Sequence, residues 1–178
     1  MSITFNQWMA LSPILIISAT IVAVMLAIAV KRHHVMNATI AVVGLNAALG
    51  ASSVLFFGPL LFPSLVPQVL PQVVTPLLVV DSFSVFYIGL ILSATLLTAT
   101  LLHPYIEGYD RNKEEIYLLL LLAGIVAVLL VCARHFATFF IGLELLSVTL
   151  YGMIASQLKK RRSLEAGVKY LVLSAAAS

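Results

Sequence analysis

Residues 136–157 read FATFFIGLELLSVTLYGMIASQ. The stretch is as long as the roughly 20 residues that a helix needs to cross a bilayer, and its one charged residue is Glu144. A carboxylate at that depth costs about 2.5 to 3.5 kcal/mol on insertion scales, so it persists only where it faces a protein interior or a water-filled path. The stretch therefore predicts a membrane helix in which Glu144 is a proton-path carboxylate. The alternative is a protonated, structural Glu144 that hydrogen-bonds to a neighbouring helix.

Composition places the whole chain in the membrane class. Of its 178 residues, 62% are hydrophobic and 10% are charged, whereas a soluble domain carries about 25% charged residues. Further apolar stretches cover residues 10–30, 35–57, 82–103, 115–132 and 164–178. The sequence therefore predicts an all-α, polytopic integral membrane protein with about six transmembrane helices in this chain.

Prolines interrupt the chain between the second and third apolar stretches. Pro59, Pro63, Pro67 and Pro71 recur every four residues. Each would cost about 3 kcal/mol inside a helix, so residues 58–80 are predicted to be an apolar, non-helical connector on the outer side of the membrane. Asp81 follows the connector directly and is predicted to cap the next helix.

The positive charges alternate between successive loops. The loops after the first, third and fifth stretches carry Lys31, Arg32, Arg111, Lys113, Lys159, Lys160, Arg161 and Arg162, whereas the loops after the second and fourth carry only Arg134. The positive-inside rule then places the N-terminus outside and the three basic loops in the cytoplasm. The basic run at residues 159–162 lies between two predicted spans, so it indicates topology rather than a nucleic-acid partner.

Two weaker candidates accompany Glu144. Lys169 lies roughly 8 Å into the sixth stretch and roughly 12 Å nearer the cytoplasmic end than Glu144, so a direct ion pair is excluded and Lys169 is a candidate proton relay. Its alternatives are snorkelling to the interface and a helix pair with Glu165, four residues earlier. Glu115 opens the fourth stretch and is the weakest candidate, because an acid in a first turn is also favoured by the helix dipole.

Motifs for other chemistry are missing from the sequence. It has no phosphate-binding loop and no dinucleotide fingerprint, and Cys132 is its one cysteine. His33 and His34 are interpreted as part of the cytoplasmic anchor, and His103 and His135 as interface residues without metal-ligand spacing. We therefore expect no cofactor and no metal site in this chain.

Four segments carry a resemblance to a known family. They read VVGLNAAL (42–49), EGYDRNKEE (107–115), GLELLS (142–147) and RSLEAGVKYLVLSAAAS (162–178). They resemble subunit N of the bacterial proton-translocating NADH:quinone oxidoreductase, respiratory complex I, which is an antiporter-like subunit. The last segment is the most specific, because it is long and hydrophobicity alone does not explain it.

The resemblance implies a multi-pass subunit of the bacterial inner membrane whose partners are the lipid bilayer and the other membrane-arm subunits. NADH, FMN, iron–sulfur clusters and quinone would bind elsewhere in the complex. Residues 1–114 would form helices 1–3, and residues 115–178 would begin the first antiporter-like repeat with helices 4 and 5 and an incomplete helix 6.

The resemblance also implies roles for the candidate residues. Glu144 matches the carboxylate of the family's fifth helix, which pairs with a lysine on a broken seventh helix that this chain does not reach. Lys169 matches a lysine of the sixth helix, and Glu115 matches an acid at the start of the fourth. Two alternatives stay open. One is a related subunit of a multisubunit cation/proton antiporter or a membrane-bound hydrogenase, and the other is a membrane scaffold that transports nothing.

Overall fold

Helices dominate the computed structural model, which describes residues 4–61, 63, 69–107, 113–155 and 161–177. They are α1 (Phe5–Val30), α2 (His34–Leu61), α3 (Ser82–Glu107), α4 (Lys113–Val131), α5 (Phe136–Ala155) and α6 (Arg161–Ala177). Helices α1 to α5 are the 5 that are long and apolar enough to cross a membrane, and α6 has 17 residues. The predicted class, an all-α polytopic membrane protein, is confirmed.

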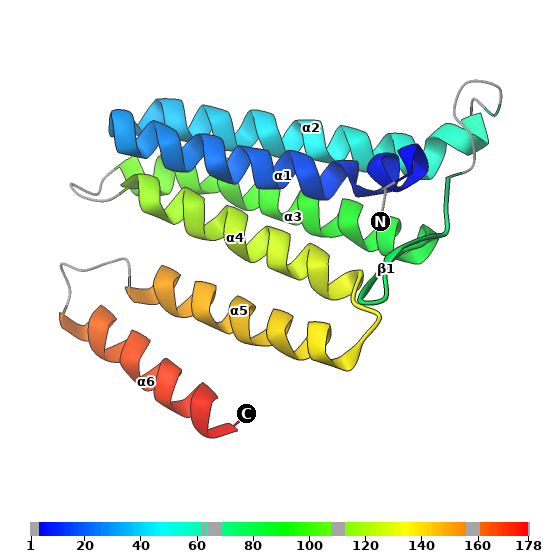
Figure 1. The fold of residues 1–178 in the computed structure, drawn as a ribbon. Coiled ribbons are helices and arrows are strands. Elements are labelled where there is room, and N and C mark those ends of the chain that lie inside the picture. Colours follow the sequence, from blue (N-terminus) through cyan, green and yellow to red (C-terminus); the bar gives the residue numbers. More distant parts are fainter. Residues whose placement is uncertain (1–3, 62, 64–68, 108–112, 156–160, 178) are drawn as a thin grey trace.

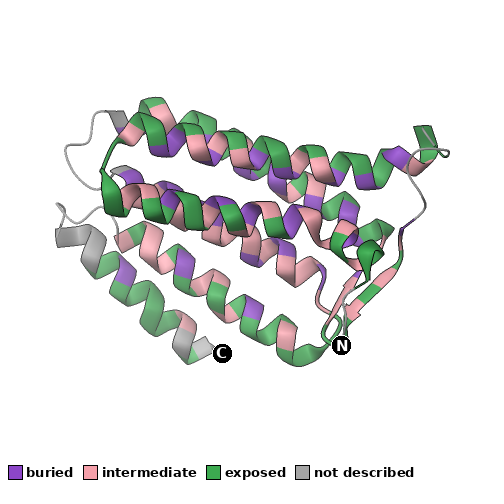
Figure 2. Cartoon of the chain, turned by 45° about the horizontal axis from the view of Figure 1, so that its top comes forward, coloured by how far each residue is buried: buried purple, intermediate pink, exposed green. Residues whose placement is uncertain are grey.

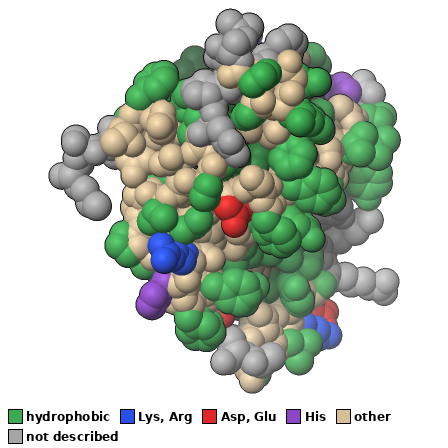
Figure 3. Space-filling view, turned by 90° about the vertical axis from the view of Figure 1, so that its right-hand side faces the viewer, with side chains coloured by type: hydrophobic (Ala, Val, Ile, Leu, Met, Phe, Trp, Pro, Cys, Tyr) green, Lys and Arg blue, Asp and Glu red, His purple; other side chains and the backbone are tan. Residues whose placement is uncertain are grey.

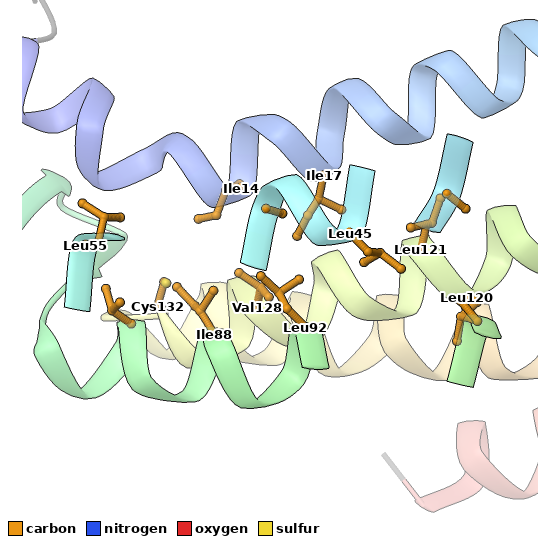
Figure 4. Packing of buried hydrophobic residues seen from close by; sticks show 14 of the residues in the cluster. Ile14, Ile17, Leu45, Leu55, Ile88, Leu92, Leu120, Leu121, Val128 and Cys132 are labelled. Carbon is orange, nitrogen blue, oxygen red and sulfur yellow. The ribbon is translucent and has the colours of Figure 1, made fainter. Parts of the chain in front are cut away.

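The first four helices pack into one bundle, and the last two lie on its outer side (Figure 1). Their shared core is formed by aliphatic side chains of α1 to α4, among them Ile17, Leu45, Leu92 and Leu121 (Figure 4). Helix α5 covers α4, and α6 covers α5. Most described side chains of α5 and α6 are intermediate or exposed (Figure 2), so these two helices present a broad apolar surface to lipid or to further protein.

The ends of the helices sort into two groups. The α1–α2 turn, the end of α3, the start of α4, the end of α5 and the start of α6 all lie at one end of the bundle (Figure 1). We call this the basic end, because Lys31, Arg32 and Lys113 lie there. The predicted loop residues Arg111, Lys159 and Lys160 fall outside the described residues. At the opposite end, hydrophobic side chains predominate and charged ones are scattered (Figure 3).

The prediction of a non-helical connector at residues 58–80 is wrong for its first residues and holds for the described residues 69–80. Helix α2 continues through Pro59 to Leu61, because a proline removes one hydrogen bond and bends a helix without having to end it there. Residues Gln72–Thr75 (β1) and Leu78–Val80 (β2) then pair as an antiparallel hairpin, with Gln72 opposite Val80. Pro67 falls outside the described residues.

Helix α3 also runs past its predicted end. The sequence placed that end at His103, before Pro104, but the helix continues to Glu107. Its start is as predicted, because the Asp81 carboxylate accepts hydrogen bonds from the Ser84 backbone N–H and hydroxyl, both 2.7 Å from Oδ1. These hydrogen bonds hold the pKa of Asp81 below its ordinary value.

The hairpin connects two parts of the bundle. The backbone N–H of Val79 donates to the Cys132 carbonyl at 2.9 Å, and that of Arg134 donates to the Leu77 carbonyl at 2.9 Å. The Gln7 side chain donates to the Val73 carbonyl at 3.0 Å. The hairpin thus joins the start of α1, which contains Gln7, to the turn between α4 and α5.

Candidate functional site

Glu144 lies near the middle of α5, between Phe136 and Ala155. Its side chain is half-buried. No hydrogen bond or ion pair connects it to any other residue that the structure describes. A carboxylate placed in this way at membrane depth requires a partner or water, and the described helices α1 to α6 do not supply the partner.

One face of α5 packs against α6. A Cβ added at Gly167 would lie 3.2 Å from the Cβ of Ala155, and the rings of Tyr151 and Tyr170 meet edge to face with centroids 5.0 Å apart. Because residues three and four apart share a helix face, Glu144 lies on the same side of α5 as Tyr151 and Ala155. The antiparallel pairing places it level with the last residues of α6.

The predicted polar stripe follows this face. Glu144, Ser147 and Tyr151 are all half-buried. The other side of α5 contacts α4, where Gly142 and Gly152 admit the side chains of Leu130 and Leu119. A Cβ added at Gly142 would lie 2.7 Å from Leu130, and one at Gly152 would lie 3.0 Å from Leu119. The glycines therefore allow the close approach of α4, and the stripe is left facing α6.

Lys169 lies apart from Glu144. Its ammonium group donates to the Glu165 carboxylate at 2.5 Å, and the two side chains are 70% and 58% exposed. Gly167 and Tyr170 face α5, so the intervening Lys169 points to another side of α6. Along the helix axes it lies roughly 12 Å nearer the basic end than Glu144. The predicted pair with Glu165 is confirmed.

Glu115 lies in the first turn of α4, as predicted. Its carboxylate is 3.5 Å from the guanidinium of Arg32, and its side chain is 39% exposed. Exposed ion pairs of this kind contribute about 0 to 1 kcal/mol. The pair fastens α4 to the α1–α2 turn at the basic end, away from the face of α5 that carries Glu144.

A polar cluster that the sequence did not predict lies at the basic end. The rings of His34 and His103 stack with centroids 4.8 Å apart and planes 5° apart. The Tyr117 hydroxyl is 3.4 Å from Nδ1 of His103, and the fully buried Asn37 lies one turn after His34. The sequence placed His34 in an anchor and His103 at an interface, and the structure adds that their rings pack against each other between helices. The members of the polar cluster come from α2, α3 and α4, so no local spacing in the sequence predicts the cluster.

The described part of the chain offers neither a group of metal ligands nor a reactive thiol. No group of three or more His, Cys, Asp or Glu side chains there could hold a metal ion. Cys132 is buried, and burial, with a smaller contribution from the charge of Asp81, raises its pKa to about 12. The thiol therefore stays protonated and is neither a nucleophile nor a ready ligand.

Two comparisons with known proteins bear on this site. Residues 133–178 match the family model described as NADH:quinone oxidoreductase/Mrp antiporter, transmembrane. Over 93% of its length the chain is also similar, with 26% identity and a TM-score of 0.71, to a chain of respiratory complex I from Thermus thermophilus solved with bound aureothin. It spans 33% of that chain. Taken together, these matches show that the chain shares its fold with part of a chain of respiratory complex I, and that residues 133–178 are similar to the transmembrane region of the NADH:quinone oxidoreductase/Mrp antiporter family.

Proposed function

We propose that the chain is part of a membrane-arm subunit of NADH:quinone oxidoreductase and contributes to proton translocation coupled to electron transfer from NADH to quinone. The observation that carries the proposal is Glu144. It is a half-buried carboxylate in an apolar helix, without a partner among the described residues, inside the segment that matches the family model. Its partner would come from residues beyond α6.

The chemistry requires a base opposite Glu144. A carboxylate about 4 Å from a lysine favours the charged lysine by about 4 kcal/mol at an effective dielectric constant of about 20. Moving one proton across 100 mV costs about 2.3 kcal/mol. Separating the two groups, or protonating Glu144, therefore changes the free energy of the protonated lysine by enough to release its proton against such a potential.

The other candidates have smaller parts in this proposal. Lys169 is a candidate relay, since it lies within residues 133–178 and, by the rise along α5 and α6, nearer the basic end than Glu144. Glu115 remains the weakest candidate, because it is engaged with Arg32. Residues 1–114 would form the helices that precede the first antiporter-like repeat, and residues 115–178 would begin that repeat.

The setting of the chain belongs to the same proposal. The subunit would lie in a bacterial inner membrane with the basic end in the cytoplasm, and its partners would be lipid and the other membrane-arm subunits. NADH, FMN, iron–sulfur clusters and quinone would be bound elsewhere in the complex. The chain itself would contribute helices and protonatable groups rather than redox chemistry.

Replacement of Glu144 tests the proposal. In the assembled complex, Glu144→Gln is expected to lower the rate of proton pumping at least tenfold, because the amide keeps the shape of the side chain and removes its charge. Pumping is measured in inverted membrane vesicles by the quenching of a pH-sensitive dye, with NADH oxidation followed in the same sample.

Two matched variants sharpen the result. Glu144→Asp retains a carboxylate and is expected to retain a substantial part of the pumping rate, whereas Ser147→Ala, one turn along the same face, is expected to change it less than twofold. Normal pumping by an assembled Glu144→Gln complex would refute the proposal. Loss of assembly with normal pumping by the remaining complex would support the scaffold alternative.

A second candidate function has one observation in its favour. The matching family model also covers Mrp antiporters, in which the same fold would exchange cations for protons without electron transfer. Co-purification of the native protein with flavin and iron–sulfur subunits would support the complex I assignment. Sodium-dependent proton exchange in vesicles without NADH would support the antiporter.

A further inference from the structure

The polar cluster at the basic end is made of four side chains from three helices. His34 and Asn37 are contributed by α2, His103 by α3 and Tyr117 by α4. The His34 ring is in contact with both other rings, with centroids 4.8 Å from His103 and 5.6 Å from Tyr117. The Tyr117 hydroxyl reaches His103 Nδ1 at 3.4 Å. The two imidazoles are therefore neighbours in contact.

Burial makes this cluster unlike an ordinary surface pair. Tyr117 and Asn37 are both 0% exposed. Neither the amide nitrogen nor the amide oxygen of Asn37 has a hydrogen-bond partner among the described residues. A buried amide in that position is normally satisfied by ordered water, which typically makes about three hydrogen bonds to polar groups around it. Asn37, one turn after His34 in α2, is thus a buried amide that requires a partner such as an ordered water.

The charges around the cluster are mixed. Glu114, one turn before Tyr117 in α4, is 9% exposed, and Glu115 beside it pairs with Arg32. Lys31 and His33 in the α1–α2 turn and Tyr105 in α3 are exposed. The residues of α1 include no titratable side chain, and α2 offers none besides His34. Acidic side chains of α4 and basic side chains of the α1–α2 turn therefore both lie at the end of the bundle that holds the cluster.

Two stacked imidazoles at this separation disfavour simultaneous protonation, because like charges in contact raise the free energy of the doubly charged state. Histidine is also the side chain whose ordinary titration falls between about pH 5 and 8. We propose that His34 and His103 form a proton-exchange site that holds one proton between them, with a water bound at Asn37, and that this site takes up protons from the aqueous phase at the basic end.

Proton uptake at this site balances simply. A hydronium ion gives its proton to one ring nitrogen of the pair and leaves as water. The charged pair later returns the proton to water or passes it onward. When His103 Nδ1 is unprotonated, the Tyr117 hydroxyl donates to it, and when Nδ1 is protonated, it donates to the Tyr117 oxygen. The use of this proton in translocation rests on the proposed function, whereas the existence of the site does not.

A proton count tests the shared site. The purified complex is titrated between about pH 5 and 8, the range of an ordinary histidine, and the protons bound by the wild type and the variants are compared. The double variant His34→Gln/His103→Gln is expected to bind one proton fewer than the wild type. A loss of two protons would show independent histidines, a loss of none would show a neutral structural stack, and either result would overturn the proposal.

A pumping profile tests the use of the site. Tyr117→Phe keeps the ring and removes the hydroxyl, so it should fold, and Asn37→Leu removes the water-binding amide at similar volume. Both are expected to slow pumping severalfold at alkaline pH, where protons are scarce, with less effect at acid pH. His33→Gln is the control, because His33 is exposed one residue from His34, and its profile should match the wild type. Unchanged profiles in both test variants would overturn the uptake role.

The two proposals fail separately. If the site does not exist, the double variant gives the wrong proton count while Glu144→Gln still lowers the pumping rate at least tenfold. If the proposed function is wrong, Glu144→Gln pumps normally while the histidine pair still binds a single proton.

Discussion

Asp81 shows at the scale of one residue how the chain fixes the start of a helix. Its carboxylate accepts two hydrogen bonds from Ser84, both at 2.7 Å. Asp81→Ala removes this N-cap and is expected to lower the free energy of unfolding by about 1 kcal/mol, as for other N-caps. Thermal denaturation of the purified protein in detergent at neutral pH measures the loss.

Acid conditions provide a second measurement on the same residue. The pKa of Asp81 is lowered in the folded protein by its hydrogen bonds with Ser84, so the ionised carboxylate stabilises the fold above its unfolded pKa of about 3.9. That contribution is lost as the pH falls through the folded pKa. Asp81→Asn keeps an N-cap acceptor without a titratable group. The stability advantage of the wild type over Asp81→Asn should therefore shrink below about pH 4, and a constant difference would contradict this account.

Single residues differ in how far their contacts and surroundings can be predicted from the sequence. Glu144 could be singled out as a candidate because an isolated charge in an apolar stretch is conspicuous without any knowledge of its neighbours. The Lys169–Glu165 pair could be predicted because its members are four residues apart on one helix. The stacked His34 and His103 could not be predicted, because their contact depends on how α2 and α3 pack.

Glycine positions govern the packing of whole helices. A Cβ added at Gly44 of α2 would lie 2.1 to 2.7 Å from three atoms of Thr20 in α1, including its Cβ. Rotation of the Thr20 side chain cannot relieve contact with its Cβ, so the two helices must separate. Gly44→Ala is therefore expected to cost about 1 to 3 kcal/mol of stability, as for other overpacked sites.

Gly50 is the matched control for this prediction. It lies in the same helix, and a Cβ added there meets nothing within 4 Å. Gly50→Ala is expected to raise the denaturation temperature slightly, because alanine is favoured over glycine inside a helix by up to about 1 kcal/mol. Thr20→Ala should restore part of the stability lost in Gly44→Ala. Equal effects of the two alanine substitutions would contradict this explanation.

Apolar length predicted every helix, but it fixed the helix ends poorly. Helix α1 was predicted from Ala10 and begins at Phe5, where the Thr4 backbone N–H donates to the Gln7 side chain at 2.9 Å. The spacing of Thr4 and Gln7 is that of a capping box, so this end was available in the sequence. The ends of α2 and α3, which lie beyond Pro59 and Pro104, could not be predicted from the sequence, because a proline bends a helix or ends it according to the surrounding packing.

The charge asymmetry of the whole molecule leads to a prediction about orientation. His33 at the basic end and His135 at the opposite end are both exposed. With the basic end in the cytoplasm, a cysteine at position 135 should react with a membrane-impermeant maleimide in spheroplasts. A cysteine at position 33 should react only in inverted vesicles.

The wild-type chain is expected to react little with the maleimide and therefore serves as the unlabelled control. Cys132 is buried and its pKa is raised to about 12, so its thiol carries little reactive thiolate at neutral pH. His33→Cys and His135→Cys then differ from the wild type by one reactive site each. The opposite labelling pattern would reverse the proposed topology.

The hairpin carries a consequence for biosynthesis. Its two strands are translated before α3 and α4, yet its hydrogen bonds with Cys132 and Arg134 need the residues that follow α4. Until the ribosome has produced α3 and α4, the Val79 N–H and the Leu77 carbonyl of the hairpin lack these hydrogen-bond partners. The hydrogen bonds that join the hairpin to the turn between α4 and α5 can therefore form only after α4 has been synthesised, so this end of the bundle is completed late in synthesis.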